Sequence, residues 1–133
     1  VQLGIFTPLL ICLLTYKTLW DISQYIIKRK GMIMEKTTMT GGTHLQGYLR
    51  ASFEQLLRAF GSPHMDQCDN YKTDVEWAFK FADGTIATLY NWKNGKNYLG
   101  DEGLELNDIY TWNVGGFDEK AVTKLKERLK EVK

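Results

Sequence analysis

Residues 73–93, TDVEWAFKFADGTIATLYNWK, decide the fold, because two runs of alternating side chains flank the dipeptide Asp83-Gly84. Asp-Gly between such runs is typical of a two-residue β-hairpin turn of type I′, in which both central residues adopt positive φ. A two-residue loop would place Ala82 opposite Thr85 and so determine every further pair along the two strands. The stretch therefore predicts an antiparallel hairpin with a defined register.

This register assigns the side chains of the hairpin to two faces, because successive residues of a strand point to opposite sides. One face is aromatic and has to be covered; its members are Val75, Trp77, Phe79, Phe81, Ile86, Thr88, Tyr90 and Trp92. The other face is mostly polar, with Leu89 as the exception; its members are Asp74, Glu76, Ala78, Lys80, Ala87, Leu89, Asn91 and Lys93. On the polar face, Asp74 is expected to lie across from Lys93 as a pair of opposite charge.

Further elements are predicted on both sides of the hairpin. Residues 44–50, HLQGYLR, alternate as a half-buried strand, with Leu45 and Leu49 on its apolar side. Ser52 and Gln55 have the spacing of a capping box, which predicts the start of a helix that ends at Gly61.

The C-terminal part predicts one more strand and one more helix. Residues 109–114 form the strand, with Tyr110, Trp112 and Val114 pointing inward, and a helix with an apolar stripe follows Asp118. Residues 96–108 are expected to be an acidic loop. The order β-α-β-β-β-α predicts an α+β domain in which an antiparallel sheet of about four strands carries two helices on one face and leaves the other face open.

The first 33 residues differ in composition from the rest of the chain. Residues 1–16 contain no charged side chain, and the apolar stretch ends at the basic cluster 28–30. Spanning a bilayer takes about 20 mainly apolar residues, and Lys17 and Asp21 interrupt this one. If it is a membrane anchor, the basic cluster places the C-terminal domain in the cytoplasm.

The second interpretation of this hydrophobic leader is translated upstream sequence. Met32 and Met34 stand where the composition changes to that of a folded domain. In that case residues 1–31 do not belong to the natural protein, which starts at one of these two methionines. Under both interpretations, residues 1–33 form a leader and residues 34–133 form a single α+β domain.

Composition and charge exclude several classes of function. The 133 residues carry 17 bases and 16 acids, and a hydrophobic content of 44% is that of a folded protein. The region 61–119 is acidic, which makes general nucleic-acid binding unfavourable. Cys12, Cys68, His44 and His64 have neither metal-ligand nor catalytic spacing. We therefore predict no catalytic residue, no metal and no cofactor.

The open face of the predicted sheet is the candidate binding surface, because it gathers hydrogen-bond donors, acceptors and an aromatic ring. A merely solvated face is the alternative, since antiparallel sheets commonly leave one side in water. The candidate ligand- or partner-binding residues are His44, Gln46, Tyr48, Arg50, Glu76, Lys80, Asn91, Lys93 and Asn113.

Four motifs resemble those of a family of small proteins encoded by phages and large DNA viruses, mostly of unassigned function. They are GTHLQGY (42–48), YKTDVEW (71–77), DGTIATLYNWK (83–93) and WNVGG (112–116), and the resemblance extends from Gly41 to the C-terminus. It implies a viral accessory role in an infected cell, such as countering host defence or redirecting host machinery.

We therefore expect a non-enzymatic viral accessory protein in the host cytoplasm that binds a host or viral protein through its polar open face. The alternative is sequestration of a small polar ligand such as a nucleotide signal, with Arg50, Lys80 and Lys93 meeting phosphate and Tyr48 stacking on a base. An enzyme ranks third. A homodimer through an edge strand is compatible with the predicted sheet.

Overall fold

The computed structural model describes residues 15–26, 32–64 and 70–132. The chain divides into two units, Val1–Ile33 and Met34–Lys133. In the first unit, residues 15–26 are helical, and no helix among the described residues is long and apolar enough to cross a membrane. Most of the uncharged run, the basic cluster and both cysteines lie outside the described residues, so both interpretations of the leader stay predictions.

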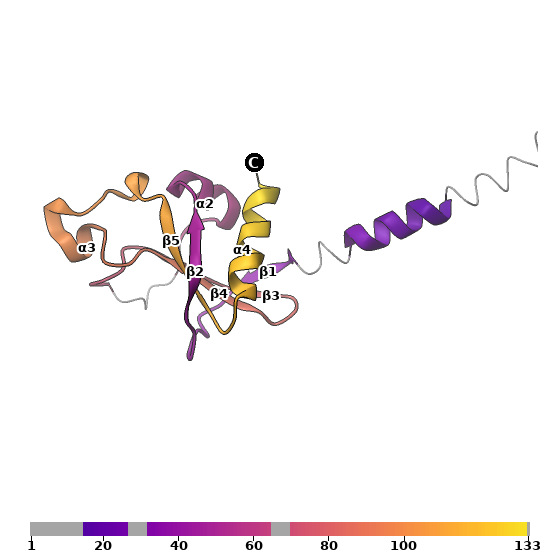
Figure 1. Cartoon of the computed structure of the whole chain (residues 1–133), viewed down its shortest axis with the longest axis horizontal. Helices are drawn as coiled ribbons and strands as arrows, with labels where there is room; N and C mark the ends of the chain where they lie inside the picture. Colours follow the sequence, from indigo (N-terminus) through magenta and orange to yellow (C-terminus); the bar gives the residue numbers. More distant parts are fainter. Residues whose placement is uncertain (1–14, 27–31, 65–69, 133) are drawn as a thin grey trace, which may run out of the picture. The chain divides into compact units, whose positions relative to one another are not determined.

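The second unit has the predicted α+β class and is built on an open antiparallel sheet with strand order β1-β3-β4-β5-β2 (Figure 1). The strands are β1 (Met34–Lys36), β2 (His44–Arg50), β3 (Glu76–Phe81), β4 (Ile86–Tyr90) and β5 (Thr111–Gly116). The longer helices are α2 (Phe53–Phe60) and α4 (Lys120–Glu131). The predicted loop 96–108 contains the short helical turns α3 (Lys96–Leu99), η1 (Gly100–Glu102) and η2 (Leu106–Asp108).

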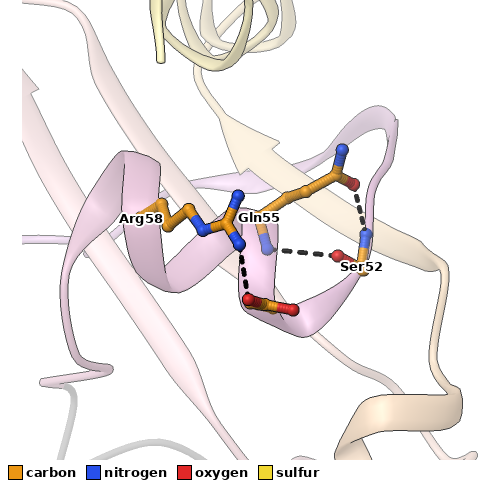
Figure 2. A network of polar contacts seen from close by, with 4 residues as sticks. Ser52, Gln55 and Arg58 are labelled. Carbon is orange, nitrogen blue, oxygen red and sulfur yellow. Dashed lines mark hydrogen bonds and ion pairs between the residues drawn. The ribbon is translucent and has the colours of Figure 1, made fainter. Parts of the chain in front are cut away.

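Helix α2 begins and ends as the sequence predicts. Ser52 Oγ accepts a hydrogen bond from the Gln55 amide at 3.1 Å, and Gln55 Oε1 accepts one from the Ser52 amide at 2.8 Å (Figure 2). The helix ends at Gly61, whose φ of 77° lies in the left-handed region that favours glycine. Local spacing alone therefore determines both ends of this helix.

Helices α2 and α4 pack on the same face of the sheet, over two buried tryptophans. The indole rings of Trp77 and Trp112 meet edge to face, with their centroids 6.0 Å apart. Trp112 Nε1 donates to the carbonyl of Ala51 at 2.9 Å, and Trp77 Nε1 donates to that of Gly61 at 2.8 Å. The two indoles therefore hold the chain at both ends of α2.

The hairpin register differs by one residue from the prediction. Phe81 pairs with Thr85 through a 2.8 Å hydrogen bond, so the loop has three residues and not two. Among the three, only Gly84 has a positive φ, of 89°. This is a type I turn followed by a left-handed glycine, the other short hairpin loop that Asp-Gly permits, and Asp83 Oδ1 supports it by accepting from the Thr85 amide at 3.0 Å.

The shift exchanges the two faces of β4, because side chains alternate along a strand. Leu89 pairs with Trp77, and Ala87 pairs with Phe79, so both residues are buried in the core. Thr88 and Tyr90, which the sequence assigned to the core, share the open face with Glu76. Leu89, the one apolar exception on the predicted polar face, is thus a core residue.

Strand β2 also departs from simple alternation. An irregularity between Leu45 and Gly47 shifts its pairing with β5. Leu45 is placed opposite Gly115 on the open face and is 46% exposed, whereas Leu49 is buried opposite Trp112. The predicted grouping of the two leucines was therefore wrong, because a bulge moves every residue before it to the other face.

We expect Gly84→Ala to lower the free energy of unfolding by about 1–2 kcal/mol, because a Cβ is strained at positive φ. The matched control is Gly41→Ala, where a Cβ would meet nothing within 4 Å and φ is not positive. Urea unfolding of both variants measures the difference. Equal stabilities would contradict the left-handed backbone of Gly84.

Candidate functional site

A row of polar side chains crosses the open face from β3 to β2, and we call it the cross-strand row. Glu76 pairs with Tyr90, Tyr90 with Asn113, and Asn113 with Tyr48. The side chain of Asn113 also hydrogen-bonds to that of Tyr90. A carboxyl, two phenols and an amide thus lie in line over four strands, because all three strand pairs are in register at this point.

Beside the row lies a cavity of about 160 Å³, which we call the open-face hollow. Thr88 and Gly115 pair across β4 and β5, so short side chains form its floor. A Cβ on Gly115 would collide with Thr88 Oγ1, which means that only glycine leaves this space open. The lining residues are Thr43, His44, Thr73, Glu76, Thr88, Tyr90, Trp92 and Gly115.

Burial perturbs both titratable side chains of the row that line the hollow. It raises the pKa of Glu76 from 4.5 to about 7, because a partly buried carboxylate loses hydration. Burial also raises the pKa of Tyr90, and the neighbouring Glu76 charge adds to this effect while the hydrogen bond from Asn113 opposes it. Perturbed groups gathered in a cavity are typical of functional sites.

Two threonines bring hydroxyl groups to the hollow. Thr88 and Thr73 are only 3% and 2% exposed, and both line the cavity. Among the described residues, neither hydroxyl has a hydrogen-bond partner, and neither does the Glu76 carboxyl. Neither hydroxyl oxygen is buried without a partner, because His64 Nδ1 is the only such side-chain atom among the described residues. Both oxygens therefore reach the solvent of the hollow, where they and the Glu76 carboxyl are available to a ligand.

Trp92 stands at the rim of the hollow and is 41% exposed. The Nζ atoms of Lys72 and Lys93 lie 5.5 Å and 5.8 Å from the centre of its ring, within the range of a cation–π contact. Lys93 Nζ also lies 5.6 Å from the ring of Tyr98. Lys93 has a φ of 56°, a conformation that costs a lysine about 1 kcal/mol.

Asn91 was predicted to bind a ligand, but it is fully buried and structural. Its Oδ1 accepts from the amides of Asp74 and Val75 at 2.9 Å and 3.2 Å. Its Nδ2 donates to Asp74 Oδ1 and to Asn94 Oδ1, each at 3.1 Å. The prediction was wrong because the register shift turns Asn91 away from the open face.

The predicted pair of Asp74 and Lys93 is absent for the same reason. The Asp74 carboxylate accepts hydrogen bonds from the Asn91 side chain and, at 3.4 Å, from the Asn97 amide. The Lys93 amide donates to the carbonyl of Lys72 at 2.7 Å, and its ammonium lies over Trp92.

The remaining predicted residues divide between the hollow and its surroundings. Tyr48, Glu76 and Asn113 belong to the cross-strand row. Arg50 pairs with Thr111, and Lys80 pairs with Glu35 and Ile86, so both lie on the open face without lining the hollow.

His44, before the bulge, and Gln46, at the bulge, behave differently. His44 lines the hollow although its register partner, Gly116, faces α4. Gln46 Nε2 donates to the carbonyl of Gly116 at 3.0 Å, so its amide is engaged within the fold.

Sequence reasoning missed three residues of the site, Thr88, Tyr90 and Trp92, because the predicted register placed them in the core. The polar atoms of Thr88 and Tyr90 were the available signal, since a core position would leave both hydroxyls in need of partners.

The comparison with protein-family models finds none that matches this chain, and the search of curated proteins finds no match either. Among the described residues, no group of three or more His, Cys, Asp or Glu side chains could hold a metal ion.

The Glu76 carboxyl makes stability depend on pH. Its pKa in the folded protein is raised, so its contribution to stability is fully present below about pH 4.5 and is lost as the pH rises through about 7. We expect the thermal midpoint of the wild-type chain to fall relative to that of Glu76→Gln between about pH 5 and about pH 8. Parallel midpoints of the two proteins over this range would show that Glu76 is not perturbed by folding.

We expect Asn91→Ala to lower the free energy of unfolding by roughly 2–4 kcal/mol, because it removes a fully buried side chain that accepts from two partly buried amides and donates to the Asp74 carboxylate. Asn113→Ala, a control on the half-buried open face, should cost less than about 1 kcal/mol. Chemical denaturation measures both. Equal losses in the free energy of unfolding would contradict a structural role for the Asn91 side chain.

Proposed function

We propose that this chain is a non-enzymatic binding protein that holds a host or viral protein on the open face of its sheet, as a viral accessory protein in an infected cell. The observation that carries the proposal is the placement of large aromatic side chains on this face around the hollow. Tyr48 is 56% exposed and Trp92 is 41% exposed. The viral setting rests on the resemblance of the four sequence motifs.

The chemistry of the face supports a protein partner. Tyrosine, tryptophan and arginine are the side chains most enriched among the residues that carry binding energy at protein interfaces. The open face offers Tyr48, Trp92 and Arg50, and the core is built by the opposite face of the sheet. Folding therefore does not account for these exposed side chains, whereas an interface does.

The open-face hollow favours a second candidate, the binding of a small polar ligand. Its size and its hydroxyl groups without partners suit a compact hydrogen-bonding molecule. A nucleotide whose phosphate meets Arg50 and Lys80 is less well supported, because neither residue lines the hollow. Of the predicted phosphate-binding residues, Lys93 is the one close to its rim, through Trp92.

We expect the immobilised full chain to capture a protein from infected cells, and Tyr48→Ala to reduce the captured amount at least about tenfold, as the loss of an aromatic anchor does. The matched control is Lys126→Ala, an exposed residue of α4 on the covered side of the sheet. Quantitative mass spectrometry of the captured protein measures both. Retention by Tyr48→Ala together with loss by Lys126→Ala would place the interface on the helices.

The small-ligand candidate makes a separate prediction. Calorimetric titration of the full chain with linear and cyclic nucleotides should give binding that Lys93→Ala weakens. No heat across the panel would remove this candidate and leave the protein partner.

A further inference from the structure

We infer that the open-face hollow is the pocket for an arginine side chain of the partner protein. The inference rests on the proposed function, which it deepens by naming the group that enters the site. It is carried by the juxtaposition of the Glu76 carboxyl, the hydroxyl of Thr88 and the ring of Trp92 around one cavity.

The charge of the hollow suits a cation. Among its described lining residues, Glu76 is the only acid, and no lysine or arginine is present. The Glu76 carboxyl has neither an ion pair nor a hydrogen bond with any described residue. A cationic guest would supply the missing partner. An anionic guest would be repelled by the Glu76 carboxylate.

The hydrogen-bonding groups select a guanidinium. A guanidinium carries five N–H donors and no acceptor, so its pocket must be rich in acceptors. The hollow offers the two carboxyl oxygens of Glu76 and the hydroxyl oxygens of Thr88 and Thr73. Carboxylates bind guanidinium groups with two parallel hydrogen bonds, a geometry that a lysine ammonium does not match.

The walls of the hollow suit a planar cation. Trp92 and Tyr90 both line it, with ring centroids 6.1 Å apart and planes at 79°. Planar guanidinium groups stack on indole faces. Trp92 is 41% exposed, so part of its ring is accessible to a guest, although the ammonium groups of Lys72 and Lys93 lie near it.

The charge of Lys93 affects a cationic and an anionic guest in opposite directions, and this difference can be tested. Lys93 would repel an arginine that enters the hollow but would attract a phosphate. Removing its charge should therefore leave arginine binding unchanged or strengthen it, and should weaken the binding of any anion.

The experiment is an NMR titration of the full chain with a blocked Gly-Arg-Gly peptide, followed through the Trp92 indole and Thr88 amide signals. The comparison peptide carries citrulline, which has the shape of arginine without its charge. We expect the citrulline peptide and the Glu76→Gln variant each to weaken binding at least about tenfold. Glu127→Gln, on α4, is the matched control and should bind as the wild-type chain does.

A second variant separates binding from folding. Thr88→Val keeps the shape of the side chain and removes a hydroxyl that has no partner among the described residues. We expect Thr88→Val to lower the affinity for the arginine peptide several-fold. The thermal midpoint of the variant should not fall, because no hydrogen bond within the fold is lost. A lower midpoint with unchanged peptide affinity would assign this hydroxyl to folding and overturn the inference.

The pH dependence supplies an independent readout. The titratable groups that share the hollow with Glu76 are His44 from β2 and Tyr90 from β4. The ammonium groups of Lys72 and Lys93 lie near Trp92 at its rim. As Glu76 ionises, the affinity for the arginine peptide should rise between about pH 6 and about pH 8. The rise should persist in His44→Gln and vanish in Glu76→Gln, whereas a phosphate ligand would show the opposite slope.

The failure of this inference is distinguishable from that of the proposed function. Equal binding of the two peptides, or weaker arginine binding in Lys93→Gln, overturns the arginine pocket. If Tyr48→Ala still abolishes capture of the partner, the protein-binding face stands without the arginine. If neither the peptide nor the partner depends on open-face residues, both proposals fall.

Discussion

The edge-to-face contact of Trp77 and Trp112 is the interaction on which the rest of the domain depends. These indoles come from β3 and β5, and their N–H groups donate to the carbonyls on either side of α2. Each indole thus buries a large apolar surface and satisfies its single donor at the same time. Because the two rings connect the sheet to both ends of one helix, the position of α2 follows from the position of the strands.

The register of the hairpin also determines which side chains lie on the open face. Leu89 lies between Trp77 and Val114 on the core side of the sheet, so its neighbours Thr88 and Tyr90 have to point the other way. A row of ionisable and polar groups then forms where four strands are in register. The open-face hollow is a consequence of the core, since Thr88 and Gly115 on its floor alternate along β4 and β5 with the residues that face the core.

Asn91 links the core to the rim of the hollow. It continues the buried side of β4 beyond the end of the strand and holds the backbone of Asp74 and Val75 with its Oδ1 atom. The adjacent residues, Trp92 and Lys93, are thereby fixed at the edge of the open face. The left-handed backbone of Lys93 fits this position, because strained residues persist where the surrounding structure over-determines them.

The sequence by itself determined the features that depend on near neighbours. The capping box of Ser52 and Gln55 predicted α2, and alternation predicted four of the strands and the α+β class, because these signals arise within a few residues. It also identified Tyr48, Glu76 and Asn113 as open-face residues. Strand β1 was missed because three residues are too few for alternation to show.

The tertiary structure alone decided which residues of β4 face the hollow. Asp83-Gly84 is compatible with a two-residue and with a three-residue loop. A shift by one residue between them exchanges Leu89 with Thr88. Burying Leu89 against Trp77 selects the three-residue loop, and the bulge after Leu45 has a comparable effect in β2. Both choices depend on contacts between strands far apart in the chain, which local patterns do not contain.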